Sequence, residues 1–164
     1  MRIITVSGAH SNVGKTRVAE MLLKELKGWS GLKVTVLHNG PCPTSRDCGA
    51  CNEIGSEFSI VSDKNIIEEK GKDTQRLKAQ GAKEVLWLKA KPEGLREGLK
   101  KAIAKFSAKG GSAYGGKGPR GIIIESNSAL KYLKPDLAIF VKGHRREKNS
   151  AQRAFKKADL IITL

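Results

Sequence analysis

The stretch GAHSNVGKT, residues 8–16, decides the fold of this chain. It follows a short apolar run at residues 2–7 and leads into residues 16–27, whose apolar side chains recur at helical spacing. This order predicts a buried strand, a glycine-rich turn, and a helix whose first backbone N–H groups are free to bind an anion. The stretch is therefore predicted to bind phosphate groups.

The residue types within this stretch suit a nucleoside triphosphate bound with Mg²⁺. A glycine at position 14 lets the backbone approach phosphate closely, Lys15 can neutralise the β and γ phosphates, and the Thr16 hydroxyl can hold Mg²⁺. The alternative is an ordinary strand–helix turn that happens to contain Gly-Lys-Thr. The predicted nucleotide-binding residues of the stretch are Gly8, Ala9, His10, Ser11, Asn12, Val13, Gly14, Lys15 and Thr16.

The spacing of the two glycines is unusual. Five residues separate Gly8 from Gly14, where the common phosphate-binding loop has four, so the position of the first motif glycine falls at Ala9. This spacing, with Val13 before Gly-Lys-Thr, resembles the loops of dethiobiotin synthetase and the cobyrinic acid amide synthases. Those enzymes belong to the P-loop class that also holds the signal recognition GTPases and the MinD ATPases.

A second segment extends the resemblance along the chain. The run GKDTQR at residues 71–76, followed by AQGA at residues 79–82, resembles a segment of molybdopterin-guanine dinucleotide biosynthesis protein B. That family is a small GTP-binding dimer that assists nucleotide attachment to the molybdenum cofactor. The resemblance spans most of residues 1–126. It implies a homodimer, a protein partner from cofactor biosynthesis and bound GTP.

The same resemblance implies an acid at the end of the strand at residues 122–125. Glu125 would then hold Mg²⁺ together with Thr16. The family continues with Glu-Gly, whereas Ser126 and Asn127 follow here. The alternative is that Glu125 is a solvated residue just past a strand.

The GKDTQR segment offers further polar groups. Asp73 could ligate magnesium or orient water, and Lys72 and Arg76 could contact phosphate or a substrate. An equally weighted alternative is a helix N-terminal turn in which Asp73 is the cap and both cations are solvated. The predicted catalytic residues are Lys15, Asp73 and Glu125, and Arg76 is included among the nucleotide-binding residues.

Two features of the sequence bear on how the nucleotide is recognised: His10 in the loop, and the residues that would select guanine or adenine. MinD-like relatives carry a lysine at the position of His10 that reaches into a partner's site. The histidine here could touch a phosphate or ribose, or could simply be exposed. The Asn/Thr-Lys-x-Asp run by which GTP-specific relatives often recognise guanine does not occur after the late strand. The sequence therefore does not separate GTP from ATP.

A cysteine cluster lies in a predicted loop at residues 39–56. Cys42, Cys48 and Cys51, with His38 just before them, could hold Zn²⁺ as a Cys₃His site. Three thiolates could equally hold an Fe–S cluster. The alternative is free thiols or a redox-active pair. We know of no such cluster in the molybdenum-cofactor relatives, so its presence indicates a divergent branch.

Composition and charge narrow the classes of protein. The 164 residues suffice for one domain, no apolar run approaches the length of a membrane span, and no signal peptide is recognised, so we expect a cytoplasmic protein. The net charge of +15 favours anionic partners. Nucleic acid is not expected, because basic residues are dispersed and aromatic residues make up only 5% of the chain.

The pattern of apolar runs predicts an α/β fold with P-loop NTPase architecture. Strands alternating with helices favour a mostly parallel sheet flanked by helices on both faces. We also expect a Gly/Lys-rich loop at residues 108–121 within a single domain of residues 1–164. The predicted strands are residues 2–7, 32–38, 57–62, 83–88, 122–125, 136–141 and 160–164, and the predicted helices are residues 16–27, 74–80, a run from Pro92, and 149–157.

Three functions compete at this point. The first is an adapter NTPase that binds Mg²⁺ with GTP or ATP, hydrolyses it slowly and serves molybdenum-cofactor biosynthesis. The second is a nucleotide-gated metal or Fe–S cluster binding and assembly protein, which the cysteines favour. The third is an ATP-dependent ligase of the dethiobiotin synthetase type, which the loop spacing favours.

Overall fold

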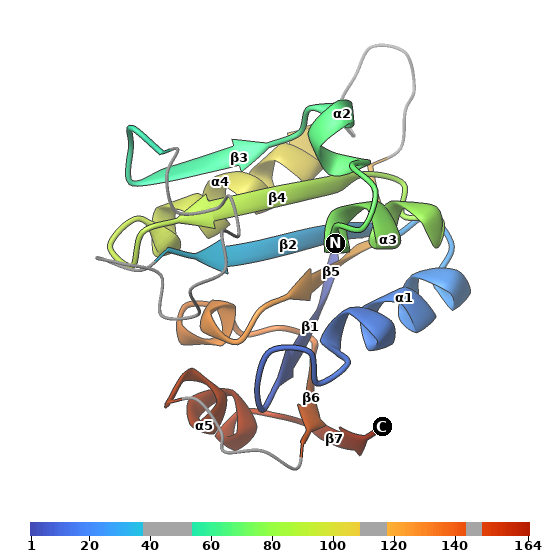
Figure 1. Cartoon of the computed structure of the whole chain (residues 1–164), viewed down its shortest axis with the longest axis vertical. Coiled ribbons are helices and arrows are strands. Elements are labelled where there is room, and N and C mark those ends of the chain that lie inside the picture. The colour runs from blue at the N-terminus through green and yellow to red at the C-terminus, as the bar shows by residue number, and fades with distance from the viewer. Residues whose placement is uncertain (38–53, 109–117, 144–148) are drawn as a thin grey trace.

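The described part of the chain forms one seven-stranded sheet (Figure 1). The computed structural model describes residues 1–37, 54–108, 118–143 and 149–164. Neighbouring strands are parallel, except that β3 is antiparallel to β4. The strands lie in the order β3-β4-β2-β5-β1-β6-β7, and their bounds are β1 Arg2–Gly8, β2 Ser30–Val36, β3 Phe58–Val61, β4 Val85–Ala90, β5 Gly121–Glu125, β6 Leu137–Lys142 and β7 Leu160–Thr163.

Helices cover both faces of this sheet, so the predicted α/β fold is confirmed (Figure 1). Alternate residues of β5 show the two faces, because Ile123 packs with α1 and α3 whereas Ile122 and Ile124 pack with α4. α5 packs beside β1 on the same face as α4. The helices are α1 Lys15–Glu25, α2 Lys64–Ile67, α3 Asp73–Ala79, α4 Leu95–Ala108 and α5 Asn149–Lys156, with a 3₁₀ helix at Ser128–Lys131.

The topology brings three chain segments to one edge of the sheet. β2, β5 and β1 are adjacent and parallel, so their carboxyl ends lie together. α1 follows β1 directly, and α3 packs against both α1 and β2. In open parallel sheets of this kind, ligands bind beyond the carboxyl ends of the strands, which places the expected site at this edge.

The element bounds differ from the sequence-based expectations in a few places. The first helix ends at Glu25, two residues before the predicted end at residue 27. β2 spans Ser30–Val36, so it begins and ends two residues before the predicted strand at residues 32–38. α2 and the 3₁₀ helix were not predicted, because each is a single short turn without a readable period.

The loop predicted at residues 108–121 was too long, because Ala108 belongs to α4 and Gly121 to β5; residues 109–117 are outside the described part. Among the described helices, none is long and apolar enough to cross a membrane.

Candidate functional site

The loop between β1 and α1 turns sharply before the helix begins. Gly14 precedes the first residue of α1 and has a φ of 102°, a left-handed conformation that favours glycine. Asn12 also has a positive φ, 64°, which asparagine tolerates better than most residues. The Gly14 carbonyl accepts the first helical hydrogen bond, from Val18 N. The chain thus passes from strand to helix through two left-handed residues, and the N–H groups at the start of α1 lie at the sheet edge.

The beginning of this loop is packed too tightly for any side chain at Gly8. A Cβ added there would lie 2.6 Å from Val13 Cγ1 and 2.9 Å from Lys15 Cγ. Asn127 fixes the same glycine from the neighbouring chain segment: Gly8 N donates to Asn127 Oδ1 at 2.8 Å, and Asn127 Nδ2 donates to the Gly8 carbonyl at 2.8 Å. The loop is therefore anchored to the end of β5 by a two-bond amide clamp.

Three predicted residues meet around the Thr16 hydroxyl. Thr16 Oγ1 lies 3.0 Å from both carboxylate oxygens of Glu125 and 3.1 Å from Asp73 Oδ1. The hydroxyl has one proton and can donate it to only one of these three oxygens at a time. Glu125 is 2% exposed, so it is a buried strand residue, and its interpretation as a solvated residue past a strand is wrong. Asp73 is the first residue of α3, and the preceding Lys72 occupies the cap position, so the interpretation of Asp73 as the cap is also wrong.

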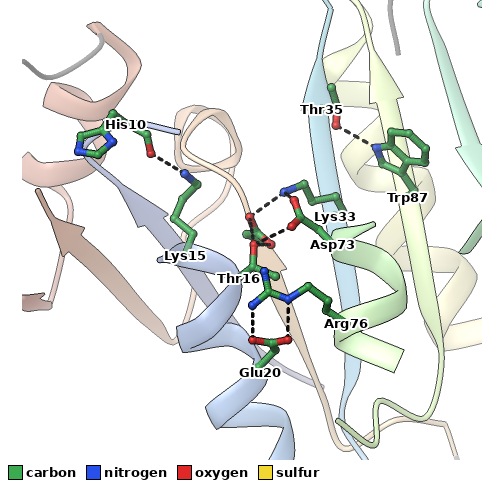
Figure 2. Close-up of polar contacts among 10 residues, drawn as sticks. His10, Lys15, Thr16, Glu20, Lys33, Thr35, Asp73, Arg76 and Trp87 are labelled. Carbon is green, nitrogen blue, oxygen red and sulfur yellow. Dashed lines mark hydrogen bonds and ion pairs between the residues drawn. The ribbon is translucent and has the colours of Figure 1, made fainter. Parts of the chain in front are cut away.

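A lysine that was not predicted completes this cluster (Figure 2). Lys33 Nζ donates to Glu125 Oε1 at 2.7 Å and also to Asp73 Oδ2. Lys33 is paired in register with Glu125 across β2 and β5, so both side chains lie on the face that α1 and α3 cover. One ammonium thus faces two carboxyl groups.

The pKa values of this cluster follow from burial and pairing. Burial acts to lower the pKa of Lys33, but the charges of Glu125 and Asp73 outweigh it and raise that pKa above its ordinary value. Burial likewise acts to raise the pKa of Asp73, but Lys33, the Thr16 hydroxyl and Arg76 together outweigh it and lower that pKa. Both partners therefore carry their charges at neutral pH.

Lys15 reaches back over the loop. Its Nζ donates to the His10 carbonyl at 2.8 Å (Figure 2). The His10 ring turns toward the chain, with Nδ1 2.7 Å from the Ser11 carbonyl oxygen, and a Cβ on Gly143 would lie 2.4 Å from its Nε2. The Lys15 ammonium is thereby held beside the loop backbone. A bound anion could replace the His10 carbonyl as its hydrogen-bond acceptor.

Arg76 is engaged by a partner that the sequence did not suggest. Its Nε and Nη2 donate to the two carboxylate oxygens of Glu20, on α1, at 2.9 and 2.7 Å (Figure 2). This bidentate pair raises the pKa of the guanidinium and ties α3 to α1. Arg76 also lines the pocket described next, whereas Lys72 forms an ion pair with Glu69 at 3.6 Å.

A pocket of about 680 Å³ opens over these residues. It runs from the β1–α1 loop across the cluster to the carboxyl end of β2. Five residues of the predicted phosphate-binding stretch and the predicted Mg²⁺-binding residues line it, whereas Gly8, Ala9, His10 and Val13 do not. Its lining consists of Ser11, Asn12, Gly14, Lys15, Thr16, Arg17, Lys33, Val34, Thr35, Val36, Asp73, Arg76 and Glu125.

The predicted cysteine cluster falls in a part of the chain for which the structure describes no residues. Cys42, Cys48, Cys51 and His38 all lie outside the described residues, so the Zn²⁺ or Fe–S site stays a prediction. Within the described ranges, no group of three or more His, Cys, Asp or Glu side chains could hold a metal. The oxygen donors around Thr16 are its own hydroxyl and the carboxylates of Asp73 and Glu125.

Two residues of the site escaped sequence reasoning. Lys33 interrupts an apolar run between Leu32 and Val34, and a charged residue at an inward position of a buried strand was its only signal. Asn127 belongs to the Ser126-Asn127 pair that follows Glu125, where the resembled family continues with glycine, and this departure was its only signal. Comparisons of the chain with family models, curated proteins and solved structures returned no match.

Proposed function

We propose that this chain binds a nucleoside triphosphate with Mg²⁺ at the β1–α1 loop and hydrolyses it slowly. One observation carries the proposal: the hydroxyl of Thr16, next to Lys15 at the start of α1, lies within 3.1 Å of carboxylate oxygens from both Asp73 and Glu125. An anion-binding helix start and a cation-binding oxygen cluster thus adjoin, as a metal–triphosphate complex requires.

The residues fit each part of such a ligand. Backbone N–H groups at the start of α1 and the Lys15 ammonium would bind phosphate oxygens, because both are positive and face the pocket. Thr16, Asp73 and Glu125 offer hard oxygen donors, the type that Mg²⁺ prefers. When bound, Mg²⁺ would neutralise charge on the triphosphate. Asp73, which is 38% exposed, is the carboxylate accessible enough to orient an attacking water.

We infer the biological role of the chain from the sequence resemblance to molybdopterin-guanine dinucleotide biosynthesis protein B. The GKDTQR segment supports an adapter that serves molybdopterin guanine dinucleotide biosynthesis as a homodimer with a protein partner. In support, the aspartate of that segment reaches the Thr16 hydroxyl from a position 57 residues along the chain.

A second candidate is a ligase that transfers phosphate to a carboxylate substrate. The pocket favours it in one respect, because Thr35 and Val36 extend its lining along β2 beyond Lys33. Phosphorus NMR of the reaction would separate the two candidates. Inorganic phosphate released without any added carboxylate indicates hydrolysis, whereas release only in the presence of a carboxylate indicates the ligase.

Nucleotide binding itself is tested by calorimetric titration of ATP and GTP in Mg²⁺, with Lys15→Ala and Lys24→Ala compared with the wild type. Lys24 is an exposed lysine of the same helix and serves as the matched control. Lys15→Ala is expected to weaken binding by ~10- to 100-fold, because it removes a charged hydrogen bond to phosphate. Equal affinities in the two variants, or no binding of either nucleotide by the wild type, would overturn the proposal.

A further inference from the structure

The ammonium of Lys33 lies among the oxygens that a divalent cation would use. It contacts Glu125 Oε1 at 2.7 Å and Asp73 Oδ2, and both carboxylates also surround the Thr16 hydroxyl (Figure 2). A cation bound by Thr16, Asp73 and Glu125 would therefore compete with Lys33 for the same acceptors.

The backbone leaves Lys33 little choice of position. The strand register sets it opposite Glu125, and the neighbouring Leu32 and Val34 point to the other face, where they pack in the core under α4. The Lys33 side chain is 19% exposed, so it is held between the sheet and α3. The lysine is thus a fixed positive charge inside the cluster.

We propose that Lys33 is a built-in counter-ion that excludes a lone divalent cation, so that the metal enters only together with the nucleotide. This inference rests on the proposed function and adds an order of loading to it. A lone Mg²⁺ would have to displace the ammonium from its two acceptors and then remain beside it, in surroundings where like charges repel strongly. A triphosphate brings negative charge that offsets both cations, so Mg²⁺ and Lys33 can share the site once the nucleotide is present.

The test is a titration of nucleotide-free, EDTA-stripped protein with Mn²⁺ alone, in which free Mn²⁺ is counted by electron paramagnetic resonance. Three chains are compared: wild type, Lys33→Met, and Lys24→Met as the control that removes the same charge from an exposed helix position. Lys33→Met is expected to bind Mn²⁺ more tightly than the wild type by ~10-fold or more, because the cluster loses its internal cation. Lys24→Met is expected to match the wild type. Equal affinities in the wild type and Lys33→Met, or the same gain in both variants, would overturn the inference.

Repeating the Mn²⁺ titration in the presence of a non-hydrolysable nucleotide measures the coupling between nucleotide binding and Mn²⁺ binding. The nucleotide is expected to strengthen Mn²⁺ binding more in the wild type than in Lys33→Met, since only the wild type has an ammonium to offset. Failure of the wild type to bind the nucleotide would sink the proposed function, while the titration with Mn²⁺ alone still decides the role of Lys33. The two failures are therefore distinguishable.

Lysine acylation of the wild type provides a measurement that needs no variant. Lys33 is expected to react slowly with an N-hydroxysuccinimide ester in metal-free protein, because its side chain is 19% exposed and paired with two carboxylates. Its modification, measured by mass spectrometry, should not rise when Mg²⁺ is added alone. A rise with Mg²⁺ alone would show that the lone cation displaces the lysine, and the inference would fail. If Lys33→Met folds only in the presence of Mn²⁺, that rescue supports the counter-ion role directly.

Discussion

Lys33 and Glu125 are paired in register on neighbouring parallel strands, and Lys33 Nζ lies 2.7 Å from Glu125 Oε1 although the residues are 92 positions apart. Glu125 is 2% exposed, and its carboxylate also accepts from the Thr16 hydroxyl. A single buried carboxylate therefore connects β2, β5 and the start of α1. Four predictions follow from this arrangement and from the loop beside it.

The first concerns the charge of Glu125. Glu125→Gln is expected to weaken binding of the Mg²⁺–nucleotide complex by ~10-fold or more, because the amide retains an acceptor for Thr16 but loses the charge that binds the cation. Calorimetry in Mg²⁺ and in EDTA checks this, with the exposed Glu69→Gln as control. The loss should be seen in Mg²⁺ and be largely absent in EDTA. An equal loss in both buffers would mean that Glu125 acts on the fold and not on the metal.

The second concerns the left-handed backbone at Gly14. Gly14→Ala is expected to lower the free energy of unfolding by about 1–2 kcal/mol, because φ is 102° there. The new Cβ would also lie 2.4 Å from Leu164 Cδ1, but Leu164 is 54% exposed and can rotate away.

Urea unfolding of Gly14→Ala, alone and combined with Leu164→Ala, separates these two causes. The second substitution should recover little stability if the backbone conformation dominates. Gly55→Ala, where an added Cβ meets nothing within 4 Å, is the matched control. Full recovery in the double variant would assign the loss to the Leu164 contact.

The third concerns Arg76, whose guanidinium is bound by Glu20. We expect Arg76→Ala to cost about 1 kcal/mol or less of stability, since the arginine side chain is 44% exposed and such pairs are screened by solvent. A double-mutant cycle with Glu20→Ala should show positive coupling between the two residues. Nucleotide affinity should fall less than in Lys15→Ala; a comparable loss would show that Arg76 leaves Glu20 to bind the ligand.

The fourth concerns the pH dependence of stability in metal-free protein. Burial acts to raise the pKa of Asp73, but the charge and hydrogen bond of Lys33, the hydrogen bond from Thr16 and the charge of Arg76 together outweigh it, so the folded-state pKa lies below the unfolded value. The stability contributed by this pair is therefore fully present above the unfolded pKa of about 4 and is lost as the pH falls through the folded pKa. The free energy of unfolding of the wild type should thus fall more steeply below about pH 4 than that of Asp73→Asn.

At alkaline pH the free energy of unfolding is expected to change in the opposite direction, falling as the pH rises. The pKa of Lys33 is raised in the folded state, so its contribution is fully present below the unfolded pKa of about 10.4 and is lost as the pH rises through the folded value. Urea unfolding in EDTA across both limbs measures these slopes. Parallel curves for the wild type and Asp73→Asn in acid would contradict the assignment of the acid limb to Asp73.

Much of the fold was predictable because the signals are local. Short apolar runs predicted all seven strands, and the Gly14-Lys15-Thr16 run correctly marked where α1 begins. Asp73 and Glu125 were chosen from short motifs, and the structure brings both to Thr16. α2 was missed because one helical turn has no period to detect.

The sequence by itself determined the order of the seven strands and of the longer helices, the glycine before α1, and the residue types that suit a metal–phosphate ligand, because each depends on neighbours a few positions away. Only the tertiary structure decided that Lys33 lies between two carboxylates, that Arg76 pairs with Glu20, and that Asn127 clamps Gly8. These contacts join residues on different strands and helices. They are set by sheet register and helix packing, which depend on the whole chain folding at once.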